Sequence, residues 1–134
     1  MHTEVSSEKL PVVLIVEDDF MTMCVLEQIL KQADLKTLTA INGVKAIDML
    51  KANSDITHIT LDLNMPVMDG YGFLDFMNRD PAFDNLKVIV NSCTSKSEFI
   101  QITQESKIST KLVIGYFEKP FIYEKLIKVI SNMN

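Results

Sequence analysis

Five short segments of the chain have strand character, and each is followed by a stretch with helical spacing. The clearest, residues 11–16, is a continuous apolar run that ends in acidic residues. Such runs are typical of strands that are buried on both faces of a parallel sheet. The predicted strands are residues 11–16, 36–40, 58–62, 86–91 and 112–117.

After each strand, apolar residues recur at intervals of three or four, which predicts helices. In the first, residues 20–34, Leu26 and Leu30 share a face and Asp19 is a plausible N-cap. The other predicted helices are centred on residues 44–50, 71–78, 97–106 and 122–130. Five strand–helix repeats predict an α/β fold, a five-stranded parallel sheet that is doubly wound, with helices on both faces.

The composition fits one domain, with 47% hydrophobic residues in a chain of 134. We expect a domain over residues 11–134 after a polar N-terminal extension, residues 1–10. The extension is no secretory signal, and the longest apolar stretch, residues 10–16, is too short to span a membrane. Two well-separated cysteines suit reduced thiols in a cytoplasmic protein. A net charge of −5 argues against direct nucleic-acid binding.

Polar and ionisable residues stand where the predicted strands end. Glu17 and Asp18 follow the first strand, Asp62 ends the third, Ser92 follows the fourth and Lys119 follows the fifth. In a doubly wound sheet ligands bind outside the carboxyl ends of the strands. Any one of these residues is commonly a turn or a helix cap. Together, in this order, they indicate a site.

Carboxylates that converge repel each other unless a cation neutralises them. Oxygen ligands alone favour a hard divalent ion such as Mg²⁺. A metal ion, an ammonium and a hydroxyl around a remaining carboxylate make an arrangement suited to phosphoryl transfer, with the carboxylate as nucleophile. The strand ends therefore predict a Mg²⁺-dependent phosphoryl site.

Four stretches match a known family: residues 13–19, with the acid pair; 61–70, reading Leu-Asp-Leu-Asn-Met-Pro-Val-Met-Asp-Gly; 88–92; and 115–121, with Lys-Pro. The sequence resembles the receiver domain of bacterial two-component response regulators from about Pro11 to its C-terminus. The resemblance implies a flavodoxin-like (βα)5 sandwich and a phosphoprotein that carries an aspartyl phosphate.

The resemblance also implies a metal site. Asp62 would accept the phosphoryl group, and Asp18 and Asp62 would ligate Mg²⁺ through their side chains. Asn64 would add its backbone carbonyl. Glu17 stands where the family more often has Asp, and would act through a metal-bound water.

The remaining roles implied by the resemblance concern the phosphoryl oxygens and the switch. Ser92 and Lys119 would each bind one oxygen, and the Lys119–Pro120 peptide is typically cis. Tyr116 matches an aromatic residue that turns inward when the serine moves. Asn64 and Thr94 occupy positions that tune dephosphorylation in the family.

A histidine kinase or a histidine phosphotransfer protein would phosphorylate Asp62, and the switched surface would bind an unknown downstream protein or a second copy of the chain. We expect no turnover of an external substrate, only Mg²⁺-dependent phosphorylation and dephosphorylation of the chain itself. The segment between Ser92 and Lys119 looks longer than is usual in the family, which leaves the partner surface open.

Two alternatives remain. One is a receiver-like interaction module that acts without phosphorylation, which the joint presence of Asp18, Asp62, Ser92 and Lys119 disfavours. The other is a phosphohydrolase with an aspartate nucleophile. Such enzymes carry an acid two residues after the nucleophile, where this chain has Asn64.

Overall fold

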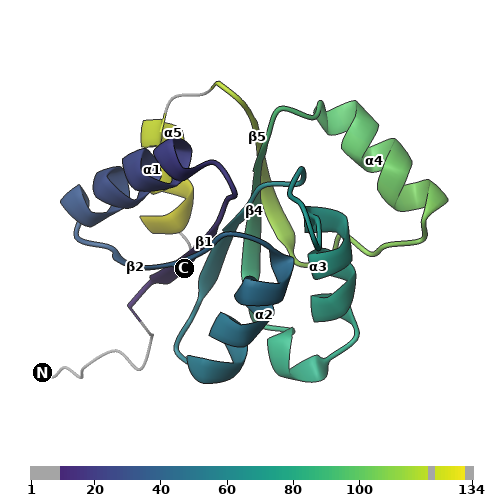
Figure 1. Cartoon of the computed structure of the whole chain (residues 1–134), viewed down its shortest axis with the longest axis horizontal. Helices are drawn as coiled ribbons and strands as arrows, with labels where there is room; N and C mark the ends of the chain where they lie inside the picture. Colours follow the sequence, from purple (N-terminus) through teal and green to yellow (C-terminus); the bar gives the residue numbers. More distant parts are fainter. Residues whose placement is uncertain (1–9, 121–122, 132–134) are drawn as a thin grey trace, which may run out of the picture.

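The computed structural model describes residues 10–120 and 123–131. In these residues five parallel strands form one sheet in the order β2-β1-β3-β4-β5 (Figure 1). The strands are β1 (Val12–Val16), β2 (Lys36–Ala40), β3 (His58–Leu61), β4 (Lys87–Ser92) and β5 (Val113–Glu118). The helices are α1 (Phe20–Gln32), α2 (Gly43–Ala52), α3 (Gly70–Asn78), α4 (Lys96–Glu105) and α5 (Tyr123–Ser131), with a short 3-10 helix, η1 (Pro81–Phe83).

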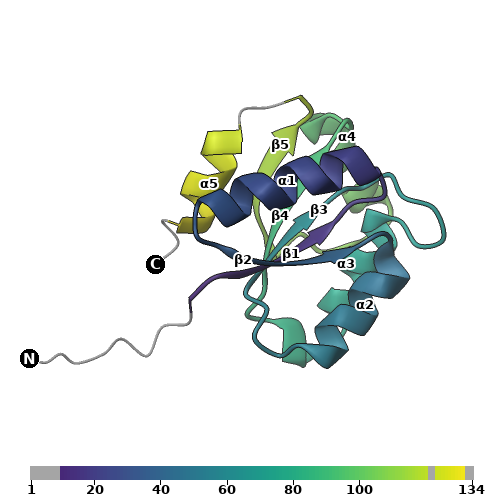
Figure 2. The same ribbon diagram turned by 60° about the vertical axis from the view of Figure 1, so that its left-hand side comes forward.

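Helices cover both faces of the sheet. α1 and α5 lie together on one face, and α2, α3 and α4 lie on the other (Figures 1 and 2). Successive side chains of a strand point to opposite faces. Val13 and Ile15 of β1 accordingly pack under α1 and α5, whereas Leu14 and Val16 pack under α2 and α3. The predicted doubly wound, flavodoxin-like α/β fold is confirmed.

Polar side chains fix where four helices begin. Asp19 caps α1 by accepting a hydrogen bond from the backbone N–H of Thr22, as the sequence predicts. Asn42, Asp69 and Ser95 cap α2, α3 and α4 in the same way. The caps of α3 and α4 therefore set the lengths of the loops that follow β3 and β4 at the carboxyl edge of the sheet.

The element bounds differ from the predicted ones at a few places. α1 ends at Gln32, before the predicted residue 34, and Asp34 takes a left-handed conformation with φ 63°, which stops a helix. The pattern gave no sign of η1, which follows the cap at Asp80. The predicted extension, apart from Leu10, and the predicted start of the last helix at residue 122 lie outside the described residues.

Both cysteines, Cys24 and Cys93, are free and exposed. The longest helix in the described part of the chain is α1, with 13 residues. No helix there is both long and apolar enough to cross a bilayer.

Candidate functional site

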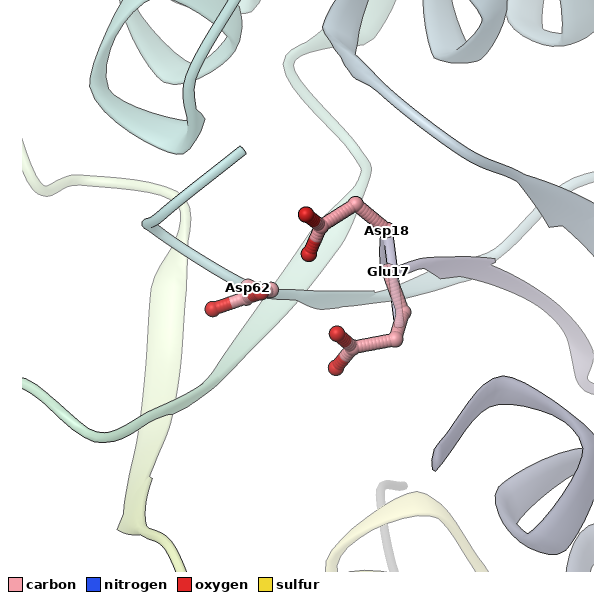
Figure 3. Close-up of side chains that lie close together, drawn as sticks. All are labelled: Glu17, Asp18 and Asp62. Atoms are coloured by element: carbon pink, nitrogen blue, oxygen red, sulfur yellow. The ribbon is translucent and has the colours of Figure 1, made fainter. Parts of the chain in front are cut away.

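Three carboxylates meet at the carboxyl edge of the sheet. Glu17 and Asp18 follow β1, and Asp62 follows β3, the neighbouring strand (Figure 3). One carboxylate oxygen from each lies within 4.8 Å of the others. Glu17 and Asp62 are buried, whereas Asp18 is exposed. The structure thus brings together the acids that the strand ends predict, with one of them open to solvent.

The loop after Asp62 is held close to the sheet by a glycine. Gly70 begins α3 and donates its backbone N–H to the carbonyl of Leu63. A Cβ atom on Gly70 would lie 2.6 Å from the backbone oxygen of Asp62, closer than real Cβ atoms approach. Only glycine therefore lets α3 start this near the end of β3, which fixes the backbone that carries Asp62.

Burial and neighbouring charges shift the pKa of the Asp62 carboxyl. Burial raises the pKa of its carboxyl, the charge of Glu17 raises it further, and the charge of Lys119 only partly offsets both, so that the pKa reaches about 7. In the absence of any added cation the site thus disfavours ionised Asp62. A divalent cation among these carboxylates would favour the ionised form, which is the form a nucleophile needs.

Lys119 supplies the positive charge of the site. Its Nζ lies 2.7 Å from Oε1 of Glu17 and 3.9 Å from Oδ2 of Asp62. Burial lowers the pKa of Lys119, but the hydrogen bond to Glu17 and the charges of Asp62 and Glu17 outweigh it and raise the pKa above its ordinary value. The ammonium is therefore charged at neutral pH.

The backbone places Lys119 beside the end of β4. Its N–H donates to the carbonyl oxygen of Ser92 at 2.8 Å, and the peptide bond to Pro120 is cis, as the resemblance implied. The serine and the lysine therefore lie on adjacent strand ends.

The donor set fits Mg²⁺. Three carboxylates cluster here, and the Lys119 ammonium lies near two of them, the buried Glu17 and Asp62, so acidic groups outnumber basic ones. All the candidate ligands are oxygens, and the exposed carboxylate of Asp18 leaves room for the waters that Mg²⁺ retains. Asn64 lies in the same loop as Asp62, with its backbone N–H 3.3 Å from Oδ1 of Asp62.

Polar side chains link the loops that follow β3 and β4. Nδ2 of Asn64 lies 3.4 Å from Oγ of Ser92 and 3.2 Å from Oγ1 of Thr94. The backbone N–H of Thr94 also donates to Oγ of Ser92, at 3.2 Å. The three residues that resemblance placed around the phosphoryl group and its hydrolysis are therefore in mutual contact.

Tyr116 of β5 reaches the same β4–α4 loop. Its hydroxyl donates to the backbone oxygen of Thr94 at 2.6 Å and of Ser95 at 3.3 Å. Burial, together with nearby acidic groups, raises the pKa of Tyr116, so the hydroxyl keeps its proton. The predicted switch residue is thus hydrogen-bonded to the loop that carries Ser92.

Sequence reasoning missed the aromatic contacts behind Tyr116. Its ring lies 5.2 Å, centroid to centroid, from that of Phe99 in α4, which in turn lies 5.9 Å from the ring of Tyr71 in α3. Only the helical spacing of Phe99 could have signalled a buried position. The three rings connect the site to α3 and α4, two of the three helices on that face of the sheet.

A family model for the response regulator receiver domain matches residues 13–131. The parallel sheet and the acidic cluster at its carboxyl edge place the chain in the class of doubly wound α/β proteins with an acidic site. The match of the family model shows that the chain belongs to the response regulator receiver domain family.

Individual relatives differ in how much of their length matches. The chain is 28% identical over 116 residues to sporulation initiation phosphotransferase F of Bacillus subtilis, covering 85% of this chain and 86% of that protein. It is 29% identical over 122 residues to the sensor histidine kinase CheAY of Helicobacter pylori, covering 90% of this chain but only 14% of CheAY. Several curated relatives are thus far longer than the region that the chain matches.

Solved structures show the same fold. The chemotaxis protein CheY4 of Vibrio cholerae superimposes with a TM-score of 0.79 at 22% sequence identity, covering 93% of this chain and 99% of that one. A sensor protein from Polaromonas superimposes with a TM-score of 0.80 at 23% identity, covering 91% of this chain and 94% of that one.

Proposed function

We propose that the chain is the phosphoacceptor of a two-component phosphorelay, and that Asp62 receives a phosphoryl group from a histidine kinase or a histidine phosphotransfer protein. The observation that carries the proposal is the meeting of three carboxylates and one ammonium at the carboxyl edge of a receiver fold. We further propose that residues 11–134 are one receiver domain and that it works in the cytoplasm.

The cofactor of this reaction would be Mg²⁺, held by the side chains of Asp18 and Asp62 and the backbone carbonyl of Asn64, with Glu17 acting through a water. When bound, the ion supplies positive charge against the phosphoryl oxygens. The other contributions come from the chain itself.

Asp62 acts as the nucleophile. A carboxylate oxygen forms a bond to phosphorus while the bond between phosphorus and the donor histidine nitrogen breaks. Lys119 and Ser92 each donate a hydrogen bond to an oxygen of the transferring group, where negative charge lies. The product is an aspartyl phosphate, which water later hydrolyses, so no external substrate is turned over.

Phosphorylation would then change the surface that partners meet. A hydroxyl of Ser92 drawn to the phosphoryl group changes the loop that Tyr116 holds through Thr94. Because this loop begins α4, a shift there alters the surface formed by α4, β5 and α5. The downstream partner would be either a different protein or a second copy of this chain.

The proposal is tested by intact-mass analysis after incubation with acetyl phosphate, with Mg²⁺ or with EDTA. The expected result is one added phosphoryl group that requires both Mg²⁺ and Asp62, so the Asp62→Asn variant stays unmodified while it remains folded. An adduct on the Asp62→Asn variant would contradict the assignment. Absence of an adduct together with absence of Mg²⁺ binding would favour a phosphorylation-independent interaction module.

A further inference from the structure

Lys119 is hydrogen-bonded to Glu17 and not to Asp62, the proposed phosphoacceptor. Nζ of Lys119 lies 2.7 Å from Oε1 of Glu17, a charge-assisted hydrogen bond, but 3.9 Å from Oδ2 of Asp62, beyond hydrogen-bond reach. The side chain of Glu17 is only 3% exposed and that of Lys119 21%. Water therefore competes weakly for this pair.

Glu17 is also fixed from its other side. Its second oxygen, Oε2, accepts a hydrogen bond of 3.1 Å from the backbone N–H of Asp19, the residue that caps α1. Both carboxylate oxygens thus have donors from the chain itself. The carboxylate is held between the start of α1 and the ammonium of Lys119, and its position is set before any ligand arrives.

The length of the glutamate side chain matters for this contact. Glu17 follows β1 and Lys119 follows β5, and the sheet order places β3 and β4 between them. The lysine therefore reaches across two strand ends to its partner. An aspartate at position 17 would be one methylene shorter and would place its carboxylate farther from the ammonium.

From these contacts we infer that Glu17 is a positioning residue for Lys119, which holds the ammonium at the edge of the site, beside Asp62 but not bonded to it. A lysine ammonium carries three N–H donors. One of them binds Glu17, and the other two remain available for a phosphoryl oxygen. Because Glu17 already fixes the position of the ammonium, less side-chain entropy is lost when the phosphoryl group binds. This inference rests on the proposed function and adds a second role for Glu17, toward the lysine and not toward the metal ion.

The two roles of Glu17 respond differently to Glu17→Asp. This change keeps the charge next to the metal ligands but shortens the reach to Lys119. The side-chain ammonium of Lys119 can be followed by proton–nitrogen NMR, because its hydrogen bond to Glu17 and its partial burial slow its exchange with water. The matched control is Glu27→Asp, since the half-buried Glu27 pairs with Lys31 within α1 and takes no part in the acidic cluster.

The expected result is loss of the protected Lys119 signal in Glu17→Asp and its retention in Glu27→Asp. The Mg²⁺ dissociation constant should stay within about twofold of the wild type, because the charge is kept. The rate of adduct formation from acetyl phosphate should fall about tenfold, the effect of one charge-assisted hydrogen bond. A retained signal with an unchanged rate would overturn the inference.

A double-mutant cycle isolates the pair. In a Lys119→Met background, Glu17→Asp should change the rate by less than about twofold, because the group that it positions is gone. If Glu17→Asp lowered the rate of adduct formation in the Lys119→Met background as much as it does in the wild type, Glu17 would act independently of the lysine and the inference would be overturned. Absence of any Mg²⁺-dependent adduct on the wild-type chain would instead overturn the proposed function, and this inference with it.

Discussion

Burial shifts the pKa of two side chains in opposite directions, one at the start of the central strand β3 and one just after its end. His58 is the first residue of β3, and Asp62 directly follows its last residue, Leu61. Burial, with the charge of Glu17 and a partial offset from Lys119, raises the pKa of the Asp62 carboxyl to about 7. Burial, with the charge of Lys87, lowers the pKa of the His58 imidazole to about 4. In both cases the neutral form is favoured, because a low-dielectric environment penalises charge.

His58 makes folding stability depend on pH. Its Nδ1 lies 2.7 Å from Oγ1 of Thr57, and its buried Nε2 has no partner among the described residues. Because the folded pKa of about 4 lies below the unfolded value of 6.5, the unfolded chain binds the proton more readily. This contribution is present above about pH 6.5 and is lost as the pH falls toward 4, by at most about 3 kcal/mol.

The measurement compares wild type with His58→Leu by urea unfolding between pH 4 and pH 7. The shift of Asp62 acts in the opposite sense over the same range, since its raised pKa lets the folded state take up a proton first as the pH falls. Both proteins contain Asp62, so its contribution cancels when their free energies of unfolding are subtracted at each pH. We expect the wild type to lose more stability than His58→Leu on acidification, and equal losses would contradict the assignment.

At the scale of elements, two glycines at the start of α3 are expected to behave oppositely. Gly70→Ala would place a Cβ atom 2.6 Å from the backbone oxygen of Asp62, and rigid backbone cannot give way cheaply. We expect about 1–3 kcal/mol of destabilisation. A Cβ atom on Gly72, at an exposed position of the helix, would lie 3.2 Å from the flexible side chain of Met68 and at an ordinary contact distance of 3.6 Å from Oδ1 of Asp69. Gly72→Ala should be neutral or stabilising by up to about 1 kcal/mol. Thermal unfolding of the two variants measures the contrast.

The ring contacts between α3, α4 and β5 allow a second comparison. Tyr116→Phe removes a hydroxyl that donates at 2.6 Å to Thr94, and should cost about 1 kcal/mol of stability. The buried hydroxyl of Tyr71 has no hydrogen-bond partner among the described residues, so Tyr71→Phe should cost nothing or stabilise. Urea unfolding of both variants tests this, and a larger loss for Tyr71→Phe would contradict it.

The sequence was sufficient for most elements because local chemistry decides them. The apolar run of β1 and the cap at Asp19 are visible without a structure, and the structure confirms both. The end of α1 cannot be predicted in this way, since the left-handed conformation of Asp34 depends on how the chain turns into β2. Sequence spacing likewise predicts that Glu17 and Lys119 share an edge, but not that they bond, because this depends on side-chain reach across two strand ends.

For the whole molecule, the excess negative charge at one edge of the sheet predicts that Mg²⁺ stabilises the fold. A ligand that binds only the folded state adds about 2.7 kcal/mol of stability at a hundred times its dissociation constant. We expect Mg²⁺ to raise the melting temperature of the wild type and to have little effect on Asp18→Asn. Asp48→Asn is the matched control, because Asp48 is exposed on α2. A Mg²⁺ response that is equal in all three proteins would contradict a metal site at Asp18.

The bond between Lys119 and Glu17 also bears on the order of assembly during synthesis. It joins positions 102 apart in the chain, so it is among the longest-range contacts the protein makes. Contacts of such long sequence separation form late, because a large loop must close first. A nascent chain that has not yet extended past residue 119 would therefore hold its acidic residues without their counter-charge. The acidic edge is completed only when the fifth strand joins the sheet.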